Sequence, residues 1–211
     1  MTEKANLAAK PILMFQQIFN SMLKNPRPTR AEASEVSNSV LDGVDGFILD
    51  TETADGDFPV NAVQSLVKCC LEAEKTIDWR KTFNDIKMYS PGPYGSAESV
   101  ACASVSAVLD LKVDLIIVAT ETGKLARMVA KYKPRVPIIC VSQNGSVIQS
   151  QLIQRGVYGV LVGETVEIEE QMVMALLEAK KMKVVETHAK IVTITASNED
   201  SPDETNVMKI M

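Results

Sequence analysis

The sequence has little of what secretion, membrane insertion or nucleic-acid binding requires. Its 211 residues carry a formal net charge of −5 and contain no block of clustered Lys and Arg, which argues against broad binding to nucleic acid or to anionic membranes. No apolar run approaches the length of a membrane span. The N-terminus has no basic-then-apolar leader pattern, and we therefore expect a cytoplasmic protein.

Cysteine and histidine are also scarce. The four cysteines, Cys69, Cys70, Cys102 and Cys140, have no metal-ligand spacing, and we interpret them as reduced thiols of a cytosolic protein. The single histidine, His188, lies in a polar segment before an apolar run, where we expect an exposed side chain. These residues predict neither a metal site nor a disulfide framework.

The first third of the chain has alternating strand and helix patterns. Residues 11–16 and 46–49 are short apolar runs typical of buried strands, and residues 29–42 and 59–77 have helical periodicity. Thr29 precedes the first helix and stands three residues before Glu32, which is the spacing of a capping box. This segment therefore predicts a strand–helix–strand–helix order.

Residues 78–95 interrupt the alternation. They contain the only tryptophan, Trp79, and the run Pro91-Gly92-Pro93. Proline and glycine at this density are typical of a turn or loop. We therefore predict a connector between two domains.

Alternation resumes over residues 96–211. Four apolar runs predict strands, and amphipathic segments between them predict helices. The runs lie at 114–119, 137–141, 157–162 and 190–195. Unbroken apolar strands between helices indicate a mostly parallel sheet covered on both faces, which is a three-layer α/β domain. Residues 206–210 are expected to add an edge strand.

Several motifs carry a family resemblance. Residues 26–32 read Pro-Arg-Pro-Thr-Arg-Ala-Glu, residues 40–45 read Val-Leu-Asp-Gly-Val-Asp, and Glu52-Thr53-Ala54 follows. Their order and spacing resemble pyruvate kinase near the end of its catalytic barrel. Residues 116–120 and 155–157 resemble the C-terminal domain of the same family.

The resemblance implies an α/β fold in which a partial (β/α) barrel remnant precedes the three-layer α/β domain. Residues 1–77 would be the last two strand–helix units of the barrel, 78–95 the connector and 96–211 the C-terminal domain. The family transfers a phosphoryl group from phosphoenolpyruvate to ADP in glycolysis and uses magnesium and potassium. Because the earlier barrel units supply the metal carboxylates and the phosphate-binding cation, no cofactor is expected for this chain alone.

No catalytic residue of the family is intact in the part that is present. Gln16 stands where the family has a substrate-binding Thr, and Phe15 replaces a small residue. Asp50 and Thr51 replace a Ser-Gly pair and add a negative charge near the phosphate position. Glu52 is retained and has two interpretations, either a group supporting the substrate site from behind or a structural contact at a strand end.

The family resemblance also points to an effector loop that binds a sugar bisphosphate. Thr120, Thr122, Gly123 and Lys124 are the remnant of that loop, and Glu121 adds a negative charge beside it. The partner loop at 196–202 lacks the family's Trp, Arg and glycines and carries two acids. Like charge opposes phosphate binding, so activation by a bisphosphate is not expected.

Two functions remain in view. The first is a truncated, non-catalytic pyruvate-kinase-like protein that acts as an oligomerisation or interaction module. The alternative is the C-terminal part of an active pyruvate kinase whose N-terminal half is missing from this chain. In either case we expect a homo-oligomer, or a hetero-oligomer with a full-length homologue, and no nucleic-acid or membrane partner.

Overall fold

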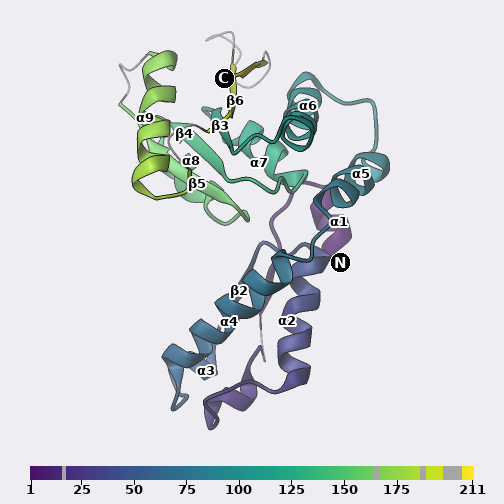
Figure 1. Cartoon of the computed structure of the whole chain (residues 1–211), viewed down its shortest axis with the longest axis vertical. Helices are drawn as coiled ribbons and strands as arrows, with labels where there is room; N and C mark the ends of the chain where they lie inside the picture. The colour runs from purple at the N-terminus through teal and green to yellow at the C-terminus, as the bar shows by residue number, and fades with distance from the viewer. Residues whose placement is uncertain (16–17, 164–166, 186–188, 197–205) are drawn as a thin grey trace. The chain divides into compact units, whose positions relative to one another are not determined.

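The computed structural model divides the chain into two compact units (Figure 1). The first unit contains Met1–Asn6 and Pro11–Asp78, and the second contains Leu7–Lys10 and Trp79–Met211. The structure describes residues 1–15, 18–163, 167–185, 189–196 and 206–211. Each unit has its own buried core.

The first unit has the predicted strand–helix–strand–helix order. Its strands are β1 (Leu13–Phe15) and β2 (Gly46–Ile48), and the main helices are α2 (Arg30–Asp42) and α4 (Pro59–Glu74). The two strands are parallel, with Leu13 opposite Gly46 and Phe15 opposite Ile48. Three short elements were not predicted: α1 (Thr2–Leu7), the 3-10 turn η1 (Asn20–Leu23) and α3 (Thr51–Ala54).

The capping box predicted for α2 is confirmed. The Thr29 side chain accepts from the backbone N–H of Glu32, and the Glu32 carboxylate accepts from the backbone N–H of Thr29 at 2.8 Å. The same carboxylate also accepts from the N–H and the hydroxyl of Ser21, at 2.8 and 2.5 Å. Glu32 therefore ties the η1 turn to the start of α2.

These hydrogen bonds make α2 sensitive to acid. Burial acts to raise the pKa of Glu32, but the hydrogen bonds from Ser21 and Thr29 outweigh it, so the pKa is lowered on balance. A lowered folded-state pKa stabilises the protein above the unfolded value of about 4.3 and loses that contribution as pH falls through the folded value.

We therefore expect Glu32→Gln to lower the free energy of unfolding by about 0.5 to 1 kcal/mol at pH 7, because the amide keeps the cap but loses the charge-assisted bonds. The difference from wild type should shrink as pH falls through the lowered folded-state pKa of Glu32. Urea unfolding followed by circular dichroism at pH 7 and at acid pH measures it. Glu35→Gln, at an exposed position of the same helix, should change little at either pH, and an equal effect of both substitutions would contradict the assignment.

The second unit is built on a five-stranded sheet. Its strands are β3 (Leu115–Ala119), β4 (Ile138–Ser142), β5 (Val157–Leu161), β6 (Ile191–Ala196) and β7 (Asn206–Ile210). The order across the sheet is β5-β4-β3-β6-β7. All neighbours are parallel except β7, which pairs antiparallel with β6 at the edge. This confirms the mostly parallel sheet and the predicted edge strand.

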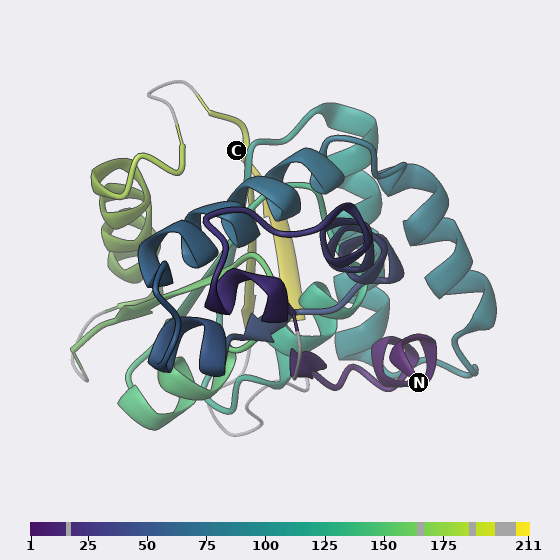
Figure 2. The same ribbon diagram turned by 90° about the horizontal axis from the view of Figure 1, so that it is seen from below.

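Helices cover both faces of this sheet. On one face lie α6 (Ser96–Leu111), α7 (Lys124–Lys131) and α8 (Gly145–Gln151), and α9 (Ile168–Lys181) lies on the other (Figure 1, Figure 2). Alternate residues of each strand point to opposite faces. Ile116 and Val118 of β3 thus face α6 and α7, whereas Leu115 and Ile117 face α9. The three-layer arrangement is confirmed.

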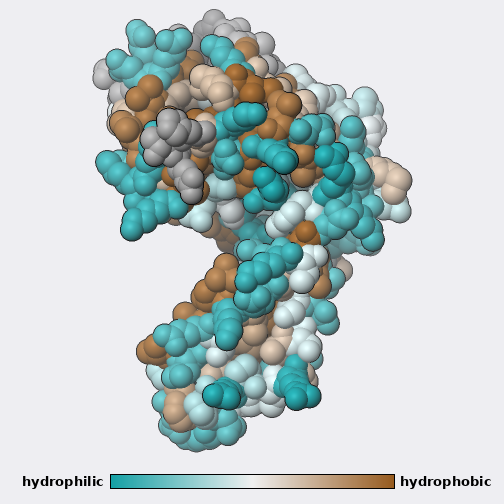
Figure 3. Space-filling view, in the orientation of Figure 1, coloured by the Kyte–Doolittle hydropathy of each residue, from teal (hydrophilic) through white to brown (hydrophobic). Residues whose placement is uncertain are grey.

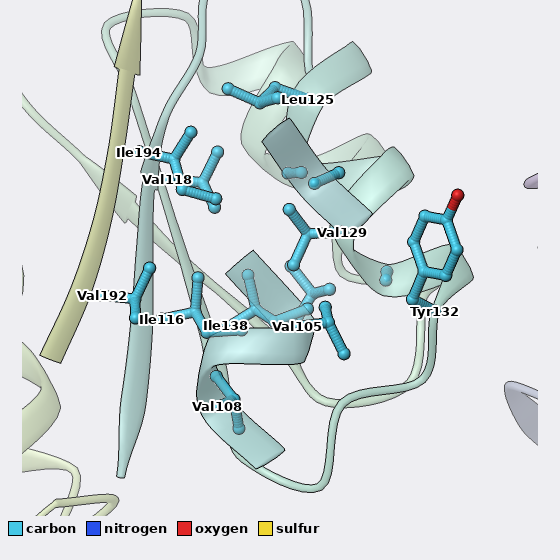
Figure 4. Packing of buried hydrophobic residues seen from close by; sticks show 14 of the residues in the cluster. Val105, Val108, Ile116, Val118, Leu125, Val129, Tyr132, Ile138, Val192 and Ile194 are labelled. Carbon is cyan, nitrogen blue, oxygen red and sulfur yellow. The ribbon is translucent and has the colours of Figure 1, made fainter. Parts of the chain in front are cut away.

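The larger core lies under α6 and α7. Val105 of α6 and Val129 of α7 pack with the strand residues Ile116 and Ile138 (Figure 4). All four are fully buried. This packing holds β3 and β4 against α6 and α7.

The connector predicted at 78–95 differs in the structure. Residues Trp79–Tyr89 form helix α5, which packs on α6. Phe83 of α5 is buried and contacts Tyr132, with the ring centroids 5.7 Å apart. The proline- and glycine-rich turn that follows, with a cis bond at Gly92-Pro93, is limited to the end of the segment.

Candidate functional site

The carboxyl ends of β1 and β2 form the position at which a (β/α) barrel carries its active site. Because the strands are parallel and Phe15 stands opposite Ile48, the segments that follow each strand leave from the same edge. Phe15 is 51% exposed there. Gln16, predicted at the substrate-binding position, lies outside the described residues.

Glu52 follows β2, but its side chain turns inward. Only 1% of the residue is exposed. One carboxylate oxygen accepts from the backbone N–H of Phe19 at 3.4 Å, and the other accepts from the N–H of Asp50 at 3.1 Å. Phe19 itself is buried in the core of the first unit. The geometry therefore supports the interpretation of Glu52 as a structural contact that fastens the β2–α3 turn to the core.

The turn that follows β2 is exposed and carries a negative charge. Asp50 and Thr51 are exposed, and Asp50 begins α3, its backbone oxygen accepting from Thr53 and Ala54. Within the described part of the chain, no three His, Cys, Asp or Glu side chains converge in a way that would hold a metal ion. Since both oxygens of Glu52 already accept from the backbone, the residues of this edge do not fit the magnesium that the family uses.

The predicted effector loop lies at the carboxyl end of β3. Thr120 is buried, and its hydroxyl accepts from the N–H of Gly123 at 3.0 Å. The Thr122 hydroxyl accepts from the N–H of Lys124 at 3.2 Å. Free N–H groups are what a helix N-terminus offers to an anion. Two of the N–H groups at the start of α7 are therefore already engaged by the loop's own side chains.

Gly123 is required by this loop for two reasons. Its φ of +78° lies in the left-handed region that favours glycine. An added Cβ would also stand 2.4 Å from the side-chain nitrogen of Gln151 in α8. Gln151 is buried and accepts from Gln154 at 3.0 Å. The sequence did not reveal this packing, because Gln151 lies 28 positions further along the chain.

The side chains of this loop provide little that would bind a phosphate. Glu121 and Lys124 are exposed, so one negative charge faces solvent beside one positive charge. Leu125, at the next position, is fully buried in the core. Of the partner loop at 196–202, Ala196 ends β6 and the rest lies outside the described residues. His188 lies outside them too.

The cysteines divide into two pairs. Cys102 and Cys140 are buried in the second unit, and Cys69 and Cys70 are half-buried on α4. All four are free thiols. Burial raises the pKa of the Cys69 thiol, which disfavours the reactive thiolate. Among the described helices, none is both long and apolar enough to cross a membrane.

Fold and site together define a class: a pair of barrel strand–helix units joined to a three-layer α/β domain. A family model described as "Pyruvate kinase, alpha/beta domain" matches residues 98–211, and one described as "Pyruvate kinase, barrel domain" matches residues 1–63. The chain belongs to the pyruvate kinase family.

Individual relatives match all or nearly all of the chain. Pyruvate kinase of Dictyostelium discoideum is 39% identical over 214 residues, covering 100% of this chain and 42% of the relative. That of Kluyveromyces lactis is 41% identical over 197 residues, covering 90% and 39%. The crystal structure of a pyruvate kinase from Cryptosporidium parvum matches with a TM-score of 0.91 at 35% identity, covering 100% of this chain and 41% of that structure. The chain thus spans about two fifths of the length of these proteins.

Proposed function

We propose that this chain is a non-catalytic pyruvate-kinase-like protein that works by association, as an oligomerisation or interaction module. The observation that carries the proposal is the apolar surface of the first unit. Its two-stranded sheet and its longest helix both expose apolar side chains. A second copy of the chain and a full-length homologue are the two partners that the surface would fit.

The strands contribute one part of this surface. Leu13, Phe15 and Ile48 are between 37% and 51% exposed. Among the described residues, β1 and β2 pair only with each other, so each has an unpaired edge. A two-stranded sheet is marginal in water, and parallel sheets are normally buried on both faces. Pairing with further strands would satisfy the unpaired edges and help to cover the exposed apolar side chains.

Helix α4 contributes the other part. Its buried side packs Ala62 and Leu66 against the core. Its outer side carries an apolar row at helical spacing, which we name the α4 stripe. The stripe consists of Val60, Val63, Val67 and Leu71, between 46% and 66% exposed. In Figure 3 apolar residues gather over the side of the first unit on which Figure 1 shows α4.

The turn after β2 supports the non-catalytic part of the proposal. Phosphoryl transfer depends on cations that neutralise the transferring group. In this chain that turn presents the exposed Asp50 and Thr51, and Glu52 is held by backbone N–H groups. A phosphate would meet negative charge there without a compensating cation from these residues.

The alternative function is the C-terminal part of an active pyruvate kinase. The observation that favours it is the continuous similarity to full-length enzymes along the chain. An open reading frame upstream of Met1 that encodes further strand–helix units would support it. Formation of pyruvate from phosphoenolpyruvate and ADP by the purified chain, with magnesium and potassium, would contradict the non-catalytic proposal directly.

Light scattering coupled to size exclusion tests the association. We expect the chain alone to elute at twice its mass or more, or else to co-elute with a full-length pyruvate kinase after mixing. Hydrogen exchange at 13–15 and 46–48 should slow in the associated form, because new strand pairing protects those amides. A monomer in both experiments, with these strands already protected, would overturn the proposal.

A further inference from the structure

The second unit has a cavity that the family assignment does not explain. It has a volume of about 1050 Å³ and opens between the starts of β3 and β4 and the end of α9. Asp114 immediately precedes β3, Pro137 precedes β4, and Lys180 and Lys183 stand at the end of α9. Trp79, at the start of α5, and Arg135 are the other polar and aromatic residues in the described part of its lining.

The charge of the described cavity lining is opposite in sign to the net charge of the chain. Among the described residues of its lining, Arg135, Lys180 and Lys183 stand against one carboxylate, that of Asp114, whereas the whole chain carries −5. Asp114 is partly engaged, because it accepts from the backbone N–H of Lys190 at 3.0 Å. Among the described residues, no ion pair joins the three cations to a carboxylate. The described part of the lining is therefore positive, and it favours a negatively charged occupant.

The aromatic wall adds a second kind of contact. Trp79 is the only tryptophan of the chain and is only partly exposed. The Arg155 guanidinium lies over its ring, 5.5 Å from the centroid. Val136, Pro137 and Val184 extend the apolar part of the lining. A flat apolar group can pack on such a surface while its charge meets the cations.

The cavity is separate from the effector-loop remnant. Strand β3 runs from Leu115 to Ala119, so Asp114 and Thr120 lie at its opposite ends. The loop at 120–124 is therefore at the carboxyl edge of the sheet, and the cavity is at the amino edge. A ligand here would share no residue with the loop.

We propose that this cavity binds a small organic anion in which a phosphate is attached to a flat apolar ring. Lys180, Lys183 and Arg135 hold the phosphate, and Trp79 with its apolar neighbours holds the ring. Lysines at the end of a helix also stabilise that end through the helix dipole. The experiment separates this structural role from binding.

Trp79 makes the binding directly measurable, because it is the sole tryptophan of the full chain. Titration with phenyl phosphate should change its fluorescence with saturation. Inorganic phosphate has the charge without the ring, and phenol has the ring without the phosphate. Each should bind at least about fivefold more weakly than phenyl phosphate. Lys180→Gln and Lys183→Gln should each weaken phenyl phosphate binding by about fivefold to tenfold, because each removes a charge-assisted hydrogen bond.

Lys181→Gln is the matched control. Lys181 stands between the two tested lysines, but it is exposed, pairs with Glu178 at 2.5 Å and does not line the cavity. It should leave the affinity unchanged, and Lys183→Arg should retain most of it. Circular dichroism verifies that each variant is folded. The proposal is overturned if fluorescence does not saturate with phenyl phosphate, or if Lys181→Gln weakens binding as much as the lining variants do.

Discussion

Replacing Glu98 by Ala is expected to lower the free energy of unfolding of the second unit by about 3 kcal/mol, which is a large share of the 5–15 kcal/mol typical of a domain. The Lys131 ammonium lies 2.5 Å from a Glu98 oxygen, and the Tyr132 hydroxyl donates to the same oxygen at 3.2 Å. Only 6% of the Lys131 side chain and 18% of the Glu98 side chain are exposed. Removing the carboxylate leaves a buried charge and a buried hydroxyl without their acceptor.

The surroundings of Tyr132 keep its hydroxyl a hydrogen-bond donor. Burial raises the pKa of Tyr132 far above its usual range, and the adjacent Cys102 and Glu98 raise it further. The hydroxyl therefore stays protonated. In Figure 4 Tyr132 lies at the margin of the core, with its ring packed beside α7.

Urea unfolding followed by Trp79 fluorescence measures the effect, because Trp79 belongs to the second unit. The matched control is Asp110→Ala, which removes an exposed pair between Asp110 and Arg80 at 3.1 Å and should cost no more than about 1 kcal/mol. The double variant with Glu98→Ala and Lys131→Met should be more stable than Glu98→Ala alone, since no buried charge remains. Equal losses for Glu98→Ala and Asp110→Ala would contradict the buried-pair assignment.

The second large effect concerns association through the α4 stripe. Val67→Glu should raise the dissociation constant of the complex by about 100-fold or more, because burying an unpaired carboxylate costs several kcal/mol. Val67 is half-exposed in the isolated chain, so the same substitution should leave the fold intact. Light scattering over a concentration series and circular dichroism measure the two properties separately.

Asn61→Glu provides the control on the same helix. Asn61 is exposed but does not belong to the α4 stripe, and Asn61→Glu adds the same charge six positions before Val67. It should leave the dissociation constant within about threefold of wild type, as expected of a surface charge outside the contact. If both variants weaken association equally, net charge and not the stripe controls it.

Local sequence determined most of the secondary structure. Short apolar runs such as 114–119, bounded by turns, are typical of buried strands, and the capping box at Thr29 and Glu32 fixes the start of α2 within the chain itself. These features depend on residues a few positions apart. The family motifs likewise lie within short stretches of the chain, and they indicate the family without any tertiary contact.

Tertiary structure alone decided the rest, because it brings together residues that are distant in sequence. Helix α5 has only a few apolar residues, and its Phe83 becomes a core residue by packing on Tyr132, 49 positions later. Glu98 and Lys131 pair across 33 positions. The cavity gathers Trp79, Arg135 and Lys183 from three separate segments. The sequence left open whether Glu52 serves the substrate site or the fold. Its buried carboxylate accepts from the backbone N–H groups of Phe19 and Asp50, which favours the fold, since a carboxylate that satisfies them stabilises the turn it belongs to.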